Sequence, residues 1–250
     1  MRNQRAPERN PRAPSVGAID RSVAILDAIA SGESRFGEIR AATGLAKATT
    51  HRLLASLATH GFVAHDDAGG YRLGPALLRL AASARRGVPL RAIAHPVLER
   101  LSTETGESAQ LYVRSGDARI CVDSVESEHE LRTIVPVGAA LPLWAGSAAK
   151  VILAHAGDAE RFLRQSSERA RFERDVAAVR SRGWASSADE RQIGVGSVSA
   201  PVLASDGGLV AVVSVSGPSS RLSRGAARRY AGAVVEAARS IEAALDGGGG

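Results

Sequence analysis

Cysteine, aromatic residues and long apolar stretches are all scarce in this sequence of 250 residues. The single cysteine, Cys121, excludes an internal disulfide framework and suits a reducing compartment, and its apolar surroundings predict a core position. Because aromatic residues make up only 4% of the chain, the core has to rest on Ala, Leu, Val and Ile. No apolar run reaches the roughly 18 residues of a membrane span, and the N-terminus lacks the apolar centre of a secretory signal. We therefore expect a cytoplasmic protein with no membrane partner.

Acidic residues are scarce in the first third of the chain. Residues 1–90 carry thirteen Lys and Arg against seven Asp and Glu, whereas residues 91–250 carry nineteen of each kind. The whole formal net charge of +6 therefore falls on the first third. Such an asymmetry favours a polyanion as the partner of that region. A solvated basic tail is the alternative explanation, because four arginines lie within the first twelve residues.

The length fits two domains better than one. Residues 1–17 mix arginines with prolines, which predicts a disordered basic tail. Residues 18–74 are expected to form one domain of three helices and a β-hairpin, because Asp67-Ala68-Gly69 has the composition of a hairpin turn. Its helices are predicted at about 20–31, 37–43 and 46–60, and its strands at 62–66 and 70–73.

A second domain of mixed helices and strands is expected over residues 91–246, followed by a flexible glycine tail at 247–250. A linker helix over 75–90, broken by Gly87-Val88-Pro89, is predicted between the two domains. The fold class is therefore α+β. Helices of the second domain are predicted at 91–105, 148–154, 158–164, 172–181 and 224–245, and strands at 108–113, 119–124, 131–135, 198–203 and 209–215.

The predicted helix after Gly44 has two contrasting faces. At the helical period, Thr50, Leu53, Leu54 and Leu57 share one face, whereas the opposite face is small or polar. A slim helix with donors near its N-terminus suits a DNA major groove, and an arginine there can donate two hydrogen bonds to guanine. An ordinary amphipathic helix is the alternative, which the adjacent hairpin and the excess charge disfavour. The candidate DNA contacts are Lys47, Thr49, His51 and Arg52 on the helix, and Tyr71 and Arg72 on the hairpin, or wing.

A series of short motifs runs along the chain, including Thr43-Gly44-Leu45, His51-Arg52-Leu53-Leu54, Gly61-Phe62-Val63, Tyr71-Arg72-Leu73-Gly74, Leu141-Pro142-Leu143, Arg182-Gly183-Trp184-Ala185 and Ser214-Val215-Ser216-Gly217-Pro218. These motifs resemble the IclR family of bacterial regulators. The resemblance covers about residues 18–245, in order and with compatible spacing. It implies a winged helix-turn-helix domain, a linker helix and a C-terminal GAF-like α/β domain that binds an effector. It also implies a homodimer or tetramer that binds palindromic, double-stranded operator DNA.

The resemblance also implies an effector site, since members of the family sense small organic acids or aromatic metabolites. A loop that enters a helix offers free N–H groups to an anion, and serines two apart on a strand point to one face. We therefore expect a carboxylate effector, and a wider apolar lining from Leu141, Leu143, Trp144 and Val202 makes an aromatic acid one candidate. The positions implied are Gly146, Ser147 and Ala148 in the loop, and Ser187, Ser197, Ser214 and Ser216.

Some positions differ from the family pattern. Ser197 stands where many members have Cys, Ser187 where many have Asp, and Trp144 where His is usual. The six histidines do not pair at the spacing of metal ligands. We therefore expect no structural zinc ion and no cofactor.

Two other classes of function remain as alternatives. Ser147 and Lys150 have the S-x-x-K spacing of a nucleophile and its base, but no S-D-N or K-T-G partner occurs. We therefore expect no enzyme, and a Ser-Lys hydrolase with a basic extension is the second hypothesis. The third is a basic tail that binds membranes or RNA without sequence preference.

Overall fold

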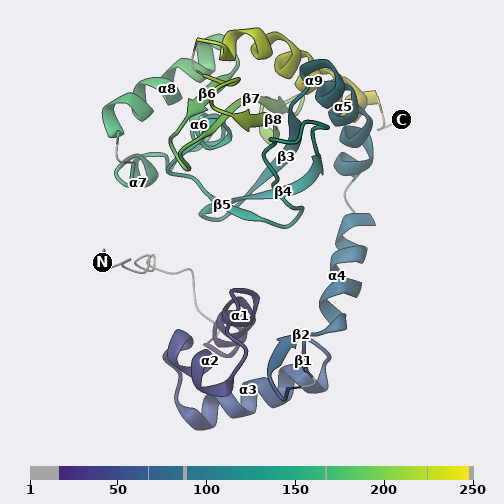
Figure 1. Ribbon diagram of the computed structural model, residues 1–250, viewed down its shortest axis with the longest axis vertical. Helices are drawn as coiled ribbons and strands as arrows, with labels where there is room; N and C mark the ends of the chain where they lie inside the picture. The colour runs from purple at the N-terminus through teal and green to yellow at the C-terminus, as the bar shows by residue number, and fades with distance from the viewer. Residues whose placement is uncertain (1–16, 67, 87–88, 167, 224, 248–250) are drawn as a thin grey trace. The chain divides into compact units, whose positions relative to one another are not determined.

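The computed structural model describes residues 17–66, 68–86, 89–166, 168–223 and 225–247. The chain divides into two compact units, 1–87 and 88–250, labelled by element in Figure 1. The predicted basic tail and glycine tail lie outside the described residues, except for Gly17 and Gly247, which belong to helices. The predicted break at Gly87-Val88 also lies outside them, whereas Pro89 begins a helix.

The first unit contains the three helices and the hairpin predicted for it. The two strands are antiparallel, with Val63 opposite Leu73. The first helix begins three residues before Asp20, so the carboxylate lies in the first turn, where the helix dipole favours it. The elements are α1 (Gly17–Ala30), α2 (Phe36–Thr43), α3 (Lys47–Thr59), β1 (Val63–His65), β2 (Tyr71–Leu73) and α4 (Pro75–Arg86).

The turn between α2 and α3 has a clear physical cause. Gly44 adopts φ 65°, a left-handed conformation that favours glycine, and its N–H donates to the carbonyl oxygen of Arg40 at 3.0 Å. At the other end of α2, Glu38 accepts a hydrogen bond from the backbone N–H of Arg35 at 2.8 Å. The α2–α3 pair then packs on α1 around the buried side chains of Ile25, Ile39 and Leu54.

The second unit is built on one antiparallel sheet with the strand order β5-β4-β3-β8-β7-β6. Its α+β class agrees with the prediction. The elements are α5 (Pro89–Thr105), β3 (Ser108–Ser115), β4 (Ala118–Val125), β5 (Ala140–Pro142), α6 (Ser147–Ala154), α7 (Glu160–Leu163), α8 (Arg169–Arg182), β6 (Ala185–Ala188), β7 (Val195–Leu203), β8 (Leu209–Pro218) and α9 (Ala227–Gly247).

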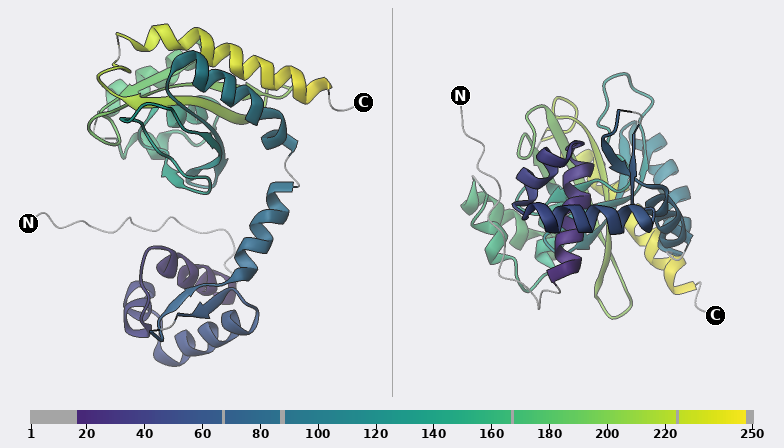
Figure 2. Two further views of the ribbon diagram at one scale, coloured as in Figure 1. Left: turned by 45° about the vertical axis from the view of Figure 1, so that its right-hand side comes forward. Right: turned by 90° about the horizontal axis from the view of Figure 1, so that it is seen from below.

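Helices cover both faces of this sheet. The helices α5 and α9 lie side by side on one face (Figure 2), and their core contains Leu98, Val234 and Ile241. The helices α6 and α8 cover the other face, where Ile152 and Phe172 are buried. As the composition predicted, aliphatic side chains dominate both cores.

The strand prediction at 131–135 is wrong. This segment belongs to the connection between β4 and β5, where Leu131 is 67% and Ile134 is 57% exposed. A side chain, and not a neighbouring strand, forms a hydrogen bond with its backbone: Arg221 Nη2 donates to the carbonyl oxygen of Leu131 at 2.9 Å. The strand that does pair with β4 is β5, with Pro142 opposite Ala118.

The short strands β5 and β6 were not predicted. The sequence of β6, Ala-Ser-Ser-Ala, lacks the β-branched and aromatic residues that mark a strand. It forms because β7 pairs with it, with Ser187 opposite Ser197.

Candidate functional site

The helix α3 has the two faces that its sequence predicts. Thr50, Leu54 and Leu57 are buried, and the Thr50 hydroxyl donates to the carbonyl oxygen of Ala46 at 3.1 Å. The candidate DNA contacts lie on the other side. Lys47, His51 and Arg52 are exposed and Thr49 is half-buried.

The two candidates in β2 differ from each other. Arg72 is exposed, and its Nε donates to the carbonyl oxygen of His65 across the hairpin at 3.3 Å. Tyr71 is half-buried, its ring lies 4.6 Å from that of His65, and its N–H donates to the carbonyl oxygen of Ser34 at 2.6 Å. Tyr71 therefore holds the hairpin in place, whereas Arg72 leaves its guanidinium at the surface.

All seven residues predicted for the effector site line one cavity in the second unit. The cavity has a volume of about 40 Å³, several times the roughly 10–15 Å³ that one water molecule needs. It lies where the N-terminus of α6 meets β6, β7 and β8. The other residues that line it are Tyr112, Arg119, Thr133, Val135, Leu141, Arg191, Gln192 and Val195. Of these, Leu141 was predicted as part of the wider apolar lining, whereas Leu143, Trp144 and Val202 are not among the lining residues.

Gly146 fixes the entry into α6. Its φ of 96° lies in the region that favours glycine. A Cβ atom at this position would also lie 2.9 Å from Nη2 of Arg119, so the guanidinium takes the space that a side chain would fill. The Gly146 N–H donates to Oε2 of Glu190 at 3.2 Å.

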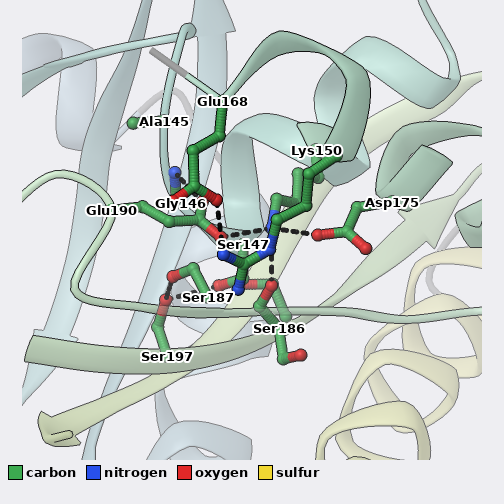
Figure 3. Close-up of polar contacts among 12 residues, drawn as sticks. Ala145, Gly146, Ser147, Lys150, Glu168, Asp175, Ser186, Ser187, Glu190 and Ser197 are labelled. Atoms are coloured by element: carbon green, nitrogen blue, oxygen red, sulfur yellow. Dashed lines mark hydrogen bonds and ion pairs between the residues drawn. The ribbon is translucent and has the colours of Figure 1, made fainter. Parts of the chain in front are cut away.

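Serine hydroxyls from α6 and three strands form one hydrogen-bonded chain, which we call the serine chain. Its members are Ser187 on β6, Ser197 and Ser199 on β7, Ser147 on α6 and Ser214 on β8. Successive oxygen–oxygen distances along Ser187–Ser197–Ser147–Ser199–Ser214 are 2.8, 2.6, 2.7 and 2.9 Å; Figure 3 shows its start. Ser199 was not predicted from the sequence, although its place two residues after Ser197 on one strand could have indicated it.

Arg119 is the most unusual group at the cavity. It is 4% exposed, and its Nη1 donates to the carbonyl oxygens of Pro142 and, at 3.0 Å, Ala145. Its guanidinium carbon lies 5.7 Å from the centre of the Tyr112 ring. Burial, together with the nearby positive charge of Arg191, lowers the pKa of Arg119 to about 10. Within the described ranges, no carboxylate forms an ion pair with it, and its buried Nε has no hydrogen-bond partner.

Lys150 lies on α6 one turn after Ser147. It is fully buried, and its Nζ donates to Asp175 Oδ2 at 2.7 Å, to Glu190 Oε1 at 2.6 Å and to the Ser186 carbonyl oxygen at 2.9 Å (Figure 3). An ammonium group has three N–H donors, so these acceptors use all of them. Lys150 therefore joins α6, α8 and β6, and no hydrogen bond of the described residues connects it to Ser147.

Comparison with protein families agrees with the two-unit structure. The family model described as "IclR helix-turn-helix domain" matches residues 18–67. The model described as "Bacterial transcriptional regulator IclR C-terminal" matches residues 82–243, more than half of the chain. The chain belongs to the IclR family. The resemblance inferred from the sequence motifs is thereby confirmed, and the protein is a transcriptional regulator with a helix-turn-helix DNA-binding domain.

Individual relatives match this IclR-family chain over most of their length. The HTH-type transcriptional regulator BhcR of Paracoccus denitrificans is 33% identical over 240 residues, which cover 90% of this chain and 86% of BhcR. The solved IclR regulator of Alicyclobacillus acidocaldarius has a TM-score of 0.79 at 25% identity, covering 92% of this chain and 98% of that one. An IclR homologue of Microbacterium hydrocarbonoxydans, solved in complex with 4-hydroxybenzoate, has a TM-score of 0.76 at 23% identity, covering 92% and 100%.

Three further observations bear on the other classes of function. The Lys150 ammonium group donates to Asp175, Glu190 and the Ser186 carbonyl oxygen, and among the described residues no hydrogen bond joins it to Ser147, as the pair in a Ser-Lys hydrolase would require. The described residues include no group of three or more His, Cys, Asp or Glu placed to hold a metal ion. None of the helices in the described ranges is long and apolar enough to cross a membrane. The absence of zinc stays a prediction, which elemental analysis of the purified protein tests.

Proposed function

We propose that this IclR-family regulator binds operator DNA with α3 and changes its DNA affinity when a small carboxylic acid enters the cavity at α6. The observation that carries the proposal is that all seven residues predicted for the effector site line one cavity, beside a buried arginine that forms no ion pair with any described carboxylate. A ligand changes DNA affinity only through its different affinity for two states of the protein. The complex of the Microbacterium homologue with an aromatic carboxylate supports the acid as a ligand class.

Specific DNA binding requires two helix-turn-helix domains. One helix-turn-helix covers only a few base pairs, so two copies of α3 have to enter the major groove about one helical turn apart. We therefore infer a homodimer, or a tetramer of dimers, joined through residues 91–246 and spaced by α4. In each copy, Lys47, Thr49, His51 and Arg52 face the DNA and Arg72 lies against the backbone. Since bacterial DNA lies in the cytoplasm, we also infer a cytoplasmic location.

A binding assay on the full-length protein tests this function. We expect it to bind the intergenic DNA upstream of its own gene at least about 10³-fold more tightly than random DNA. We also expect at least one small carboxylic acid to change that affinity, and sedimentation to show a dimer or larger assembly. Equal affinity for both DNAs would favour the basic-tail hypothesis, and hydrolysis of an ester substrate would favour the Ser-Lys hydrolase.

A further inference from the structure

The hydrogens of the serine chain can be assigned from the acceptor at its end. Ser214 lies 3.3 Å from the carbonyl oxygen of Val198, which can only accept, so the Ser214 hydroxyl donates there. Each hydroxyl has one hydrogen to donate. Ser199 therefore donates to Ser214, Ser147 to Ser199, Ser197 to Ser147 and Ser187 to Ser197.

This order decides what the serines offer to a ligand. Every hydroxyl of the serine chain uses its hydrogen inside the protein, and Ser216, which also lines the cavity, donates to Gln110 Oε1 at 2.9 Å. What remains toward the cavity is oxygen lone pairs. These oxygens accept a hydrogen bond from a ligand hydroxyl, whereas they repel a carboxylate.

The donors for an anion lie on another strand. Arg119 projects from β4, which β3 and β8 separate from the serine-bearing β7. Its guanidinium lies against Gly146 at the positive end of the α6 dipole, where a buried cation is unfavourable without an anion. Arg191 also lines the cavity and adds positive charge, and the buried Nε of Arg119 has no partner among the described residues.

The size of the cavity limits the rest of the ligand. About 40 Å³ is well below the roughly 150 Å³ of an apolar cavity that admits benzene. The structure therefore favours a compact aliphatic acid over the aromatic acid that the nearby apolar residues suggested.

We propose that the cavity binds a small 2-hydroxy acid of two or three carbons in one orientation, with the carboxylate on Arg119 and Arg191 and the hydroxyl donating to the serine chain. This inference rests on the proposed function, because it names the class of acid that the sensor recognises. Arg119 is then the residue that selects an anion, and Ser187, at the start of the serine chain, is a residue that selects the hydroxyl.

Calorimetry on the full-length protein tests the ligand chemistry without changing the protein. Glycolate is the probe, acetate lacks its hydroxyl, glycolamide lacks its charge, and mandelate adds an aromatic ring. We expect glycolate to bind at least tenfold more tightly than each of the other three. Equal affinity of glycolate and acetate, or of glycolate and glycolamide, would overturn the proposal.

Three variants separate recognition from folding. Ser187→Ala removes the first acceptor of the serine chain, and we expect it to bring the glycolate-to-acetate affinity ratio close to one while acetate affinity stays within about twofold. Arg119→Met should abolish binding of every acid, whereas Arg119→Lys should retain part of it. Since Arg119 also holds two carbonyl groups, operator binding and the midpoint of thermal unfolding serve as folding controls. An unchanged affinity ratio in Ser187→Ala contradicts the assignment of the hydroxyl even if Arg119→Met fails to fold.

The outcome also separates this inference from the proposed function. If 4-hydroxybenzoate or acetate changes operator affinity and hydroxy acids do not, the inference fails and the sensor function stands. If no acid binds or alters operator affinity, both fail.

Discussion

The only two lysines of the chain lie one in each unit and have opposite surroundings. Lys47 is exposed at the first residue of α3, on the face proposed to meet DNA. Lys150 is fully buried in α6 and forms ion pairs with Asp175 and Glu190. The lysine on the DNA-reading surface is thus available to an external anion, whereas the lysine in the sensor domain joins α6 to α8 and to the segment after β6. Changes in the first region should affect binding, and changes in the second should affect folding.

The largest expected effect is on stability. Lys150→Met keeps much of the side-chain volume but removes the buried ammonium group that forms ion pairs with Asp175 and Glu190, which should lower the free energy of unfolding by about 3 kcal/mol. Lys47→Met is the matched control, with an expected change within about 0.5 kcal/mol, because a cation at a helix N-terminus contributes nothing favourable there.

The position of the two tryptophans makes this measurement specific. Trp144 and Trp184 both belong to the second unit, so tryptophan fluorescence during urea unfolding reports on residues 88–250 alone. Circular dichroism follows both units. If the two lysine variants had similar midpoints by fluorescence, the ion pairs of Lys150 would not stabilise the sensor.

The second expected effect is in the serine chain. Ser147 is 1% exposed and bonds to two other serines, so Ser147→Leu both overfills its site and removes one hydrogen-bond partner from each of Ser197 and Ser199. We expect a loss of about 2 kcal/mol in the stability of the sensor and complete loss of the acid response, with operator binding retained.

Ser147→Ala is the control for that variant, because it removes the hydroxyl without filling the cavity. It should weaken the acid response only partly. Unchanged acid affinity in Ser147→Leu, measured by calorimetry, would place the effector elsewhere in residues 91–245.

The same contrast explains what could be predicted from the sequence. The faces of α3 follow from local helical periodicity, because solvent contacts its outer residues whatever the rest of the chain does. The serines of the cavity were found through a family resemblance, and the structure then brought them together. Arg119 and Arg191 were missed because α6, β4 and the loop between β6 and β7 meet at the cavity only in the folded sheet, far apart in sequence. The wrong strand at 131–135 has the same cause, since the Arg221 side chain takes a backbone carbonyl there.

The third expected effect is on how the protein recognises the DNA sequence. Arg52→Ala removes an exposed side chain and should cost operator binding about 1–3 kcal/mol if the guanidinium contacts a base, with a much smaller loss on random DNA. The free energy of unfolding of the Arg52→Ala variant should not change. Arg40→Ala, an exposed arginine on α2, is the control and should affect both DNAs equally. Equal losses on both DNAs for Arg52→Ala would make it a phosphate contact.

The smallest expected effect is in the salt dependence of DNA binding, where Lys47 is informative a second time. Each phosphate contact contributes about 0.9 to the slope of log affinity against log salt concentration. If each copy of a dimer places Lys47 on one phosphate, Lys47→Met should reduce the slope by about 1.8 on operator and random DNA alike. A reduction of the slope by about 0.9 would indicate that only one helix-turn-helix of the dimer contacts the DNA. No reduction would mean that the exposed lysine does not reach the backbone, and the excess charge of the first third would then have to act through other residues.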